Sequence, residues 1–341
     1  MTGLAALMAS PALPVLSGGA IAAPATGQRL KPPRIKPGDT IGLIEPASAS
    51  DDPFDLVLVE EAIRAMGLVP KRAPNLLKRY GYLAGQDKER GSDITAMFAD
   101  KDVKAIFAVR GGWGAARTLP FVDWDVVRAN PKFLIGYSDI TALHMAIAAK
   151  GGAVTLHGPN ASSAWGRASV ESFKGIAFDG ETPLFENPKA TEDRLVQRRW
   201  RTIKIRGGKA QGQLLGGNLT VLTALAGTPY LPDFAGAILF LEDIDEAEYR
   251  IDRMLTQLGQ AGVLKGLAGV VFGQCTNCRN PDGSSFTLNS ILRQHFEPLG
   301  IPAFEGAWFG HISDQFTIPQ GVRAEIDADA GTLRLLEPAV A

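Results

Sequence analysis

Residues 133–150 read FLIGYSDITALHMAIAAK, and this stretch decides the fold. Residues 133–136 form a short apolar run that is typical of a buried strand, and we expect a helix over residues 139–150. Tyr137 and Ser138 between them leave room for only a sharp strand-to-helix turn. The stretch therefore predicts one βα unit of an α/β protein.

The same alternation continues on both sides of this unit. Strands that alternate with helices predict parallel β-α-β units over about residues 36–160. A segment with scattered charges follows at 165–208, and a second apolar series comes after it. We therefore expect two domains joined near residues 190–210. The further predicted strands are 41–44, 104–109, 237–241, 269–273 and 324–327, and the further predicted helices include 60–66, 91–100 and 246–258.

Length and charge narrow the class of protein. The 341 residues suffice for one large or two ordinary domains. The 35 Lys and Arg residues nearly balance the 36 Asp and Glu residues, which gives a net charge of −1. A dedicated nucleic-acid binder normally has a basic excess, so we expect no nucleic-acid partner.

Residues 1–28 have a different character from the rest of the chain. They carry no charge, and an apolar stretch ends in small residues that fit an A-x-A cleavage site at 20–22 or 23–25. They are interpreted as a signal peptide whose basic start lies upstream, or as a disordered Ala- and Pro-rich tail. Prolines and glycines interrupt the stretch, so no stable membrane span is expected. We expect export to the periplasm, or a cytoplasmic protein if the signal does not function.

Glycines directly follow the predicted strand 104–109, in Arg110-Gly111-Gly112-Trp113-Gly114. Glycines at the carboxyl end of a strand let backbone N–H groups approach a ligand. The motif is interpreted as a dinucleotide loop, a simple turn, or a backbone cradle for an oxyanion or carboxylate. Arg117 stands where a dinucleotide fingerprint has its third glycine, which disfavours the first interpretation.

Ser138 occupies the turn of the opening stretch. A serine there projects its hydroxyl at the edge of the sheet, and the next N–H, that of Asp139, lies at a helix N-terminus, as in a nucleophile elbow. Ile140 replaces the second glycine of the G-x-S-x-G form. Ser or Asp before a helix is also an ordinary N-cap. Ser138 is therefore either a nucleophile or a cap.

A nucleophilic serine needs a basic histidine. His311 lies in a loop among glycines and aromatic residues, and His157 lies at a strand end, so both are candidates. His144 lies six residues beyond Ser138 and would face elsewhere, and His295 belongs to a charged helical run.

The base needs an orienting acid, and Glu242 directly follows the apolar run 237–241. The carboxyl end of a buried strand is where sites form in α/β sheets. Asp243, Asp245 and Glu246 follow closely, and such a run is also typical of a solvated helix start or a divalent-metal site. The pair Cys275 and Cys278 has no second pair to complete a structural zinc site, so a local disulfide, free thiols, or a metal or redox role remain.

Eight motifs stand in order over about residues 36–335: GDTIGLIEPAS, VRGGWGAAR, FLIGYSDITALH, LHGPN, GQLLGGNLTVL, LFLEDIDEAEYRIDRMLTQL, GVVFGQ and GHISDQFTIPQG. Together they resemble the serine LD-carboxypeptidase family, which comprises muramoyltetrapeptide carboxypeptidases and microcin-immunity peptidases. The family tends to have a Pro-Ser pair after the first strand, where this chain has residues 45–48, EPAS.

The resemblance implies a Ser–His–Glu triad. Ser138 would be the nucleophile, Glu242 the orienting acid and His311 the base. The backbone N–H groups of Gly112 and Asp139 would form the oxyanion hole. Arg110 would hold the substrate carboxylate, or it would form a structural ion pair. The substrate-binding residues implied by motif are Arg110, Gly111, Trp113, Gly217 and Asn218.

The resemblance also implies the architecture. It predicts a Rossmann-like N-terminal domain with a parallel sheet over 33–190, a linker over 191–208, and a smaller β-rich C-terminal domain over 209–338. The site would lie between the domains, and the protein would be a homodimer.

The implied reaction releases terminal D-alanine from peptidoglycan tetrapeptides through an acyl-enzyme, with no metal or cofactor. The expected partner is a small muropeptide. Two alternatives stay open. An immunity-type peptidase would cleave a peptide–nucleotide antibiotic and stack its base on Trp113 or Trp165. A non-catalytic module would only bind cell-wall peptides.

Overall fold

The computed structural model describes residues 29–189, 195–279 and 286–341. The predicted signal peptide or tail, residues 1–28, lies outside the described residues, and so does the first part of the predicted linker, up to residue 194. Among the helices that are described, none is both long and apolar enough to cross a bilayer.

The first sheet has six strands in the order β12-β5-β4-β3-β1-β2 within the described residues. Five strands from the N-terminal half are parallel, and β12 from the C-terminal half pairs antiparallel with β5. The order places a topological switch point between β1 and β3, where α/β proteins bind ligands. The strands are β1 (Thr40–Ile44), β2 (Val69–Arg72), β3 (Val103–Ala108), β4 (Phe133–Gly136), β5 (Thr155–His157) and β12 (Ile318–Gln320).

Helices connect these strands. The first, α1 (Pro53–Ala65), begins where the Asp52 carboxylate accepts a hydrogen bond from the N–H of Phe54, and it buries Leu56, Val59 and Ile63. The segment after β4 is one continuous helical stretch whose hydrogen-bond pattern changes along its length: η2 (Ser138–Ile140), α4 (Thr141–Ala146) and the π-helical η3 (Ile147–Gly151). The other helical elements are α2 (Asp87–Ala99), η1 (Ala115–Phe121), α3 (Trp124–Ala129), α5 (Arg167–Lys174) and η4 (Gly175–Asp179).

The second sheet has eight strands in the order β6-β14-β13-β8-β9-β10-β11-β7, again within the described residues. Its centre, β8 to β11, is parallel, and the outer strands are antiparallel. The strands are β6 (Leu184–Phe185), β7 (Ile203–Arg206), β8 (Lys209–Asn218), β9 (Ile238–Ile244), β10 (Gly269–Thr276), β11 (Ala303–Glu305), β13 (Arg323–Asp327) and β14 (Thr332–Leu335). The helices are α6 (Leu219–Ala224), α7 (Glu248–Gln260), α8 (Leu288–Phe296) and η5 (Glu297–Leu299).

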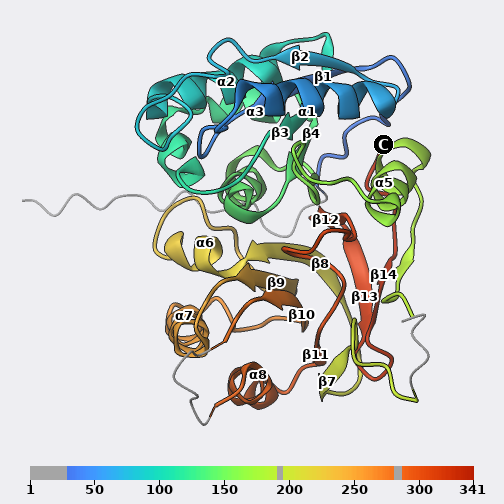
Figure 1. Cartoon of the computed structure of the whole chain (residues 1–341). Coiled ribbons are helices and arrows are strands. Elements are labelled where there is room, and N and C mark those ends of the chain that lie inside the picture. Colours follow the sequence, from blue (N-terminus) through green and yellow to red (C-terminus); the bar gives the residue numbers. More distant parts are fainter. Residues whose placement is uncertain (1–28, 190–194, 280–285) are drawn as a thin grey trace, which may run out of the picture.

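The two sheets lie one above the other in Figure 1, and they share hydrophobic core. One buried cluster contains Phe107 and Ile135 of the first sheet together with Phe240 of the second. They also exchange strands, because β6 joins the second sheet and β12 the first. The described part of the predicted linker contains β7, which pairs with β11 at the edge of the second sheet. The predicted α/β fold, with a parallel N-terminal sheet and a β-rich C-terminal part, is confirmed.

Candidate active site

Ser138 lies between β4 and α4 with a φ of 64°. This left-handed conformation is unfavourable for a residue with a side chain, and it is typical of strained turns at functional sites. The residue that caps η2 is Tyr137, and its side chain makes no capping bond. Across the part of the chain that the structure describes, the Ser138 hydroxyl oxygen accepts no capping hydrogen bond from a main-chain N–H either. The geometry is therefore that of a nucleophile elbow and not of a serine cap.

The glycine loop after β3 lies directly against this turn. A Cβ at Gly111 would lie 3.0 Å from the Ser138 Cβ and 3.2 Å from its Oγ, so glycine is what allows the close approach. Gly112 has a φ of 107°, again in the left-handed region that favours glycine. In the described residues, the N–H groups of Gly112 and Asp139 donate to no protein acceptor. Both remain available for a developing oxyanion.

Two hydrogen bonds donated by main-chain N–H groups help to attach the glycine loop to its surroundings. The Asp139 carboxylate accepts the N–H of Ala115 at 2.7 Å, and the Ser48 hydroxyl accepts the N–H of Trp113 at 3.0 Å. Burial raises the pKa of Asp139 to about 6, although the bond from Ala115 and the charge of Arg90 oppose this shift. Ser48 belongs to the loop after β1, so the contact joins the two loops that flank the switch point.

Arg90 is a structural residue of this site that sequence reasoning missed. Its side chain is 1% exposed and comes from α2. It donates to the carbonyls of Gly85 (3.2 Å), Gly114 (2.9 Å) and Pro46, and it pairs with Asp87. Arg90 thus joins the loop after β1 to the loop after β3 through hydrogen bonds to a main-chain carbonyl of each. The sequence signal, an Asp and an Arg three residues apart on a helix, is indistinguishable from an ordinary surface pair.

Glu242 and His311 form the charged pair of the site. Glu242 lies on β9 and is fully buried, and its Oε2 accepts a hydrogen bond from His311 Nδ1 at 2.7 Å. A Cβ at Gly310 would lie 2.9 Å from the Glu242 Cβ, so the glycine before His311 permits this approach. With Nδ1–H donated to the carboxylate, Nε2 is the nitrogen that remains to accept a proton.

The pKa of His311 reflects two opposing effects. Burial lowers the pKa of the imidazole, but the hydrogen bond and the negative charge of Glu242 outweigh burial and raise it above the ordinary value of 6.5. The His311 ring also packs on the ring of Tyr137, with 4.8 Å between centroids. Because Tyr137 precedes Ser138, this contact brings the histidine to the serine turn.

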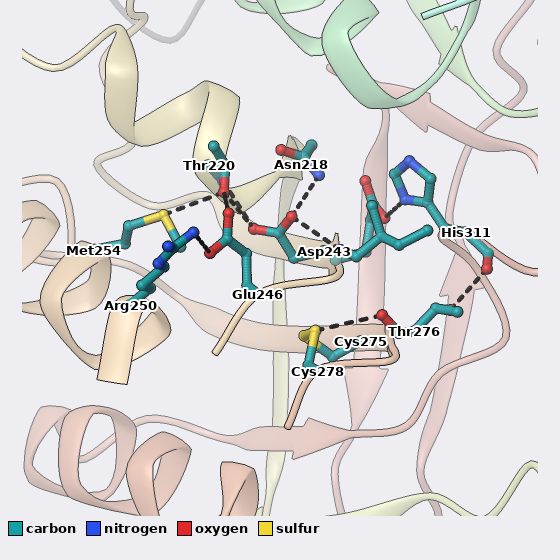
Figure 2. Close-up of a disulfide and its surroundings, with 12 residues drawn as sticks. Asn218, Thr220, Asp243, Glu246, Arg250, Met254, Cys275, Thr276, Cys278 and His311 are labelled. Atoms are coloured by element: carbon teal, nitrogen blue, oxygen red, sulfur yellow. Dashed lines mark hydrogen bonds and ion pairs between the residues drawn. A yellow bond between two sulfur atoms is a disulfide. The ribbon is translucent and has the colours of Figure 1, made fainter. Parts of the chain in front are cut away.

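Asp243, the residue after Glu242, takes part in a local hydrogen-bond network. Asp243 accepts hydrogen bonds from the side-chain N–H of Asn218 at 2.9 Å and from the backbone and hydroxyl of Thr220 at 3.0 and 2.9 Å (Figure 2). Burial, followed by the charge of Glu242, raises the pKa of Asp243 to about 6. In the described ranges no group of three or more His, Cys, Asp or Glu side chains is arranged to hold a metal ion.

The predicted substrate-binding residues fall into two groups. Asn218 caps α6, because its Oδ1 accepts the N–H of Val221 at 3.1 Å, so its amide contributes both groups to the fold. A Cβ at Gly217 would lie 2.5 Å from the Thr141 hydroxyl, so this glycine allows β8 to approach α4. Arg110 and Trp113 are more accessible. Arg110 donates to the carbonyl of Ala49 at 3.0 Å and lies 3.6 Å from the Asp51 carboxylate.

The other histidines lie elsewhere. His144 is buried, with one ring nitrogen 2.8 Å from the Thr155 hydroxyl and the other 2.8 Å from the Gly136 carbonyl, and burial lowers its pKa to about 4. His157 is fully buried beside Tyr137, and burial lowers its pKa well below the ordinary value. His295 of α8 pairs with Asp252 of α7 at 2.7 Å. Cys275 and Cys278 form a disulfide, one of the states that the sequence left open.

Comparisons with known proteins show which family the chain belongs to. The sequence model of the LD-carboxypeptidase N-terminal domain matches residues 41–158, and that of the C-terminal domain matches residues 211–326. A probable murein peptide carboxypeptidase of Bacillus subtilis is 38% identical over 87% of this chain and 91% of its own length.

Solved structures show the same likeness. A muramoyltetrapeptide carboxypeptidase from Oxalobacter formigenes superposes with a TM-score of 0.74 and 31% identity, over 87% of this chain and 97% of its own. The microcin C7 self-immunity protein, known from Escherichia coli, superposes with a TM-score of 0.82 and 26% identity, over 92% of this chain and all of its own. The resemblance found in the motifs is confirmed, and the chain belongs to the LD-carboxypeptidase family.

Proposed function

We propose that this protein is a serine LD-carboxypeptidase that releases terminal D-alanine from peptidoglycan tetrapeptides. The observation that carries the proposal is the Glu242–His311 pair, 2.7 Å apart with Glu242 fully buried, beside a serine in a left-handed turn. The order Ser, Glu, His along the chain is one that serine hydrolases use. The murein peptide carboxypeptidase relatives support the choice of substrate.

In the proposed reaction His311 Nε2 takes the proton of the Ser138 hydroxyl while Oγ attacks the carbonyl carbon of the scissile peptide. The N–H groups of Gly112 and Asp139 stabilise the negative charge on the carbonyl oxygen. When the C–N bond breaks, His311 gives its proton to the amine of D-alanine, which leaves. A water molecule then repeats the sequence on the acyl-enzyme and releases the shortened peptide.

A carboxypeptidase must also recognise a free carboxylate. Arg110 directly precedes Gly111, and its guanidinium has five donors, of which one bonds to the Ala49 carbonyl. The nearby carboxylate of Asp51 is largely exposed and lies 3.6 Å away, so that ion pair is weak. We propose that Arg110 pairs with the carboxylate of D-alanine.

An immunity-type peptidase is the second candidate, because the chain superposes closely on the microcin C7 self-immunity protein. Trp165 packs edge-on against Phe107 and Phe173 in the core, which leaves Trp113 as the ring available to stack a base. Measuring kcat/KM for a tetrapeptide and for an aminoacyl-sulfamoyl nucleoside under the same conditions separates the two. Faster turnover of the tetrapeptide supports our proposal, and faster turnover of the nucleoside contradicts it.

The raised pKa of His311 predicts the pH dependence of the reaction. A protonated His311 cannot act as a base, so kcat/KM should fall as the pH drops through the pKa of the free enzyme. Because Glu242 stabilises the imidazolium, the midpoint of this acidic limb should lie above 6.5, the ordinary value for histidine. The measurement is kcat/KM for a tetrapeptide between about pH 5 and 9. A midpoint at or below 6.5 would contradict the assignment of His311.

A further inference from the structure

We propose that Thr276, at the end of β10 and beside the Cys275–Cys278 disulfide, is a positioning residue that fixes the main chain of His311. The inference rests on the proposed function, because it concerns the base of the triad. The Thr276 hydroxyl donates a hydrogen bond to the His311 carbonyl at 2.7 Å, as Figure 2 shows. His311 is thus held at two points, its ring by Glu242 and its main chain by Thr276.

Hydrogen bonds from the end of β10 hold the segment 306–311, which leads up to and includes His311. The N–H of Gln274 donates to the Phe309 carbonyl at 2.9 Å. The Gln274 side chain donates to the carbonyls of Gly306 and Ala307 at 2.8 and 3.1 Å. The Thr276 hydroxyl extends this series to His311. The segment 306–311 contains two glycines, so these bonds limit the freedom of a chain that carries the base.

Thr276 is itself held from two sides. Its carbonyl accepts the N–H of Asp245 at 2.8 Å, and it stands in register with Ile244 of β9. On the other side the disulfide closes the turn 275–278, in which Asn277 adopts a left-handed conformation with a φ of 58°. A covalent link between its flanking residues keeps the turn, and with it Thr276, in place.

The direct test compares Thr276→Val, which removes the hydroxyl and keeps the shape, with Thr276→Ser, which keeps the hydroxyl. Thr228→Val is the matched control, because Thr228 also donates to a main-chain carbonyl, that of Leu225 at 2.8 Å, but away from the site. Displacing a catalytic group by about 1 Å costs up to about 100-fold in rate. We expect T276V to lower kcat by about 10- to 100-fold with KM unchanged, and T276S and T228V to keep kcat within about twofold. An unchanged kcat in a folded T276V protein would overturn the proposal.

The second readout needs no substrate. NMR titration of the His311 ring, assigned with a His311→Gln variant, reports its contact with Glu242. Glu242 and Tyr137 contact the ring directly, and Asp243, Asp245 and His157 lie close enough to act on it electrostatically. If Thr276 fixes His311, T276V should lower the pKa of His311 relative to the native chain, and T276S should leave it unchanged. An equal pKa in all three proteins would contradict the inference, whether or not the tetrapeptide is the substrate.

The disulfide provides a test in the native chain, which has two cysteines. An excess of a dithiol reductant transfers two electrons to the Cys275–Cys278 bond and yields two thiols, while the reductant becomes a disulfide. We expect the fully reduced protein, verified by a count of two thiols per chain, to lose kcat with KM unchanged, as T276V does. A fully reduced and folded protein with native kcat would contradict the role of the disulfide.

Discussion

Replacing Ser138 with alanine is expected to lower kcat for D-alanine release by about 10⁴- to 10⁶-fold, while the melting temperature stays the same. The serine oxygen forms the acyl-enzyme, and no neighbouring group can take its place. Alanine keeps the Cβ of serine, so the strain of the left-handed turn, with a φ of 64°, is the same in both proteins. The loss of activity should therefore come without a change in the fold.

The measurement is single-turnover hydrolysis of a defined tetrapeptide, together with thermal unfolding of both proteins. Ser162→Ala is the matched control, because Ser162 is exposed on the loop that follows β5. This variant should keep both its activity and its melting temperature. Native kcat in Ser138→Ala would remove Ser138 from the reaction and with it the proposed triad.

Replacing Glu242 with glutamine should lower kcat by about 10⁴-fold. The carboxylate accepts the Nδ1–H of His311 at 2.7 Å, which leaves Nε2 free to act as the base. A glutamine amide can donate its N–H to Nδ1 instead, which places the imidazole proton on Nε2, the nitrogen that must accept from Ser138. The variant also loses the charge that stabilises the imidazolium during the reaction.

Asp243→Asn is the control for this prediction, since it alters the adjacent buried carboxylate. Asp243 accepts bonds from Asn218 and Thr220, and an asparagine cannot accept all of them. It should lower the free energy of unfolding by about 1–3 kcal/mol with a much smaller effect on kcat than Glu242→Gln. Steady-state kinetics and urea unfolding measure the two effects. Similar losses of kcat in both variants would contradict the specific role of Glu242.

The elements that the sequence predicted well are those determined by interactions between residues close together along the chain. The apolar run 133–136 became β4, and the expected turn holds Ser138 at a positive φ, because a strand that leads directly into a helix leaves few conformations. Glu242 could be suggested in the same way, from its place at the end of a buried strand. The choice of His311 over His157 depended on the family motifs, since the local sequence makes both candidates, His157 at a strand end and His311 in a loop among glycines and aromatic residues.

Contacts between distant segments could not be predicted from the sequence. Arg90 and Ser48 organise the glycine loop through bonds to residues between 24 and 65 positions away along the chain. Thr276 reaches His311 across 35 positions. Nothing in their local sequence distinguishes them from surface or turn residues. The exchange of β6 and β12 between the sheets could not be predicted either. These strands have two and three residues, which are too few to show a periodicity.

The most direct test of the account is the mass of the products formed when the native protein is incubated with a tetrapeptide that ends in D-alanine. The account predicts a tripeptide and free D-alanine in equal amounts, and neither product with Ser138→Ala. An intact tetrapeptide that binds tightly would identify a binding module. Cleavage at any other bond, or equal cleavage by the Ser138→Ala protein, would contradict the proposed reaction.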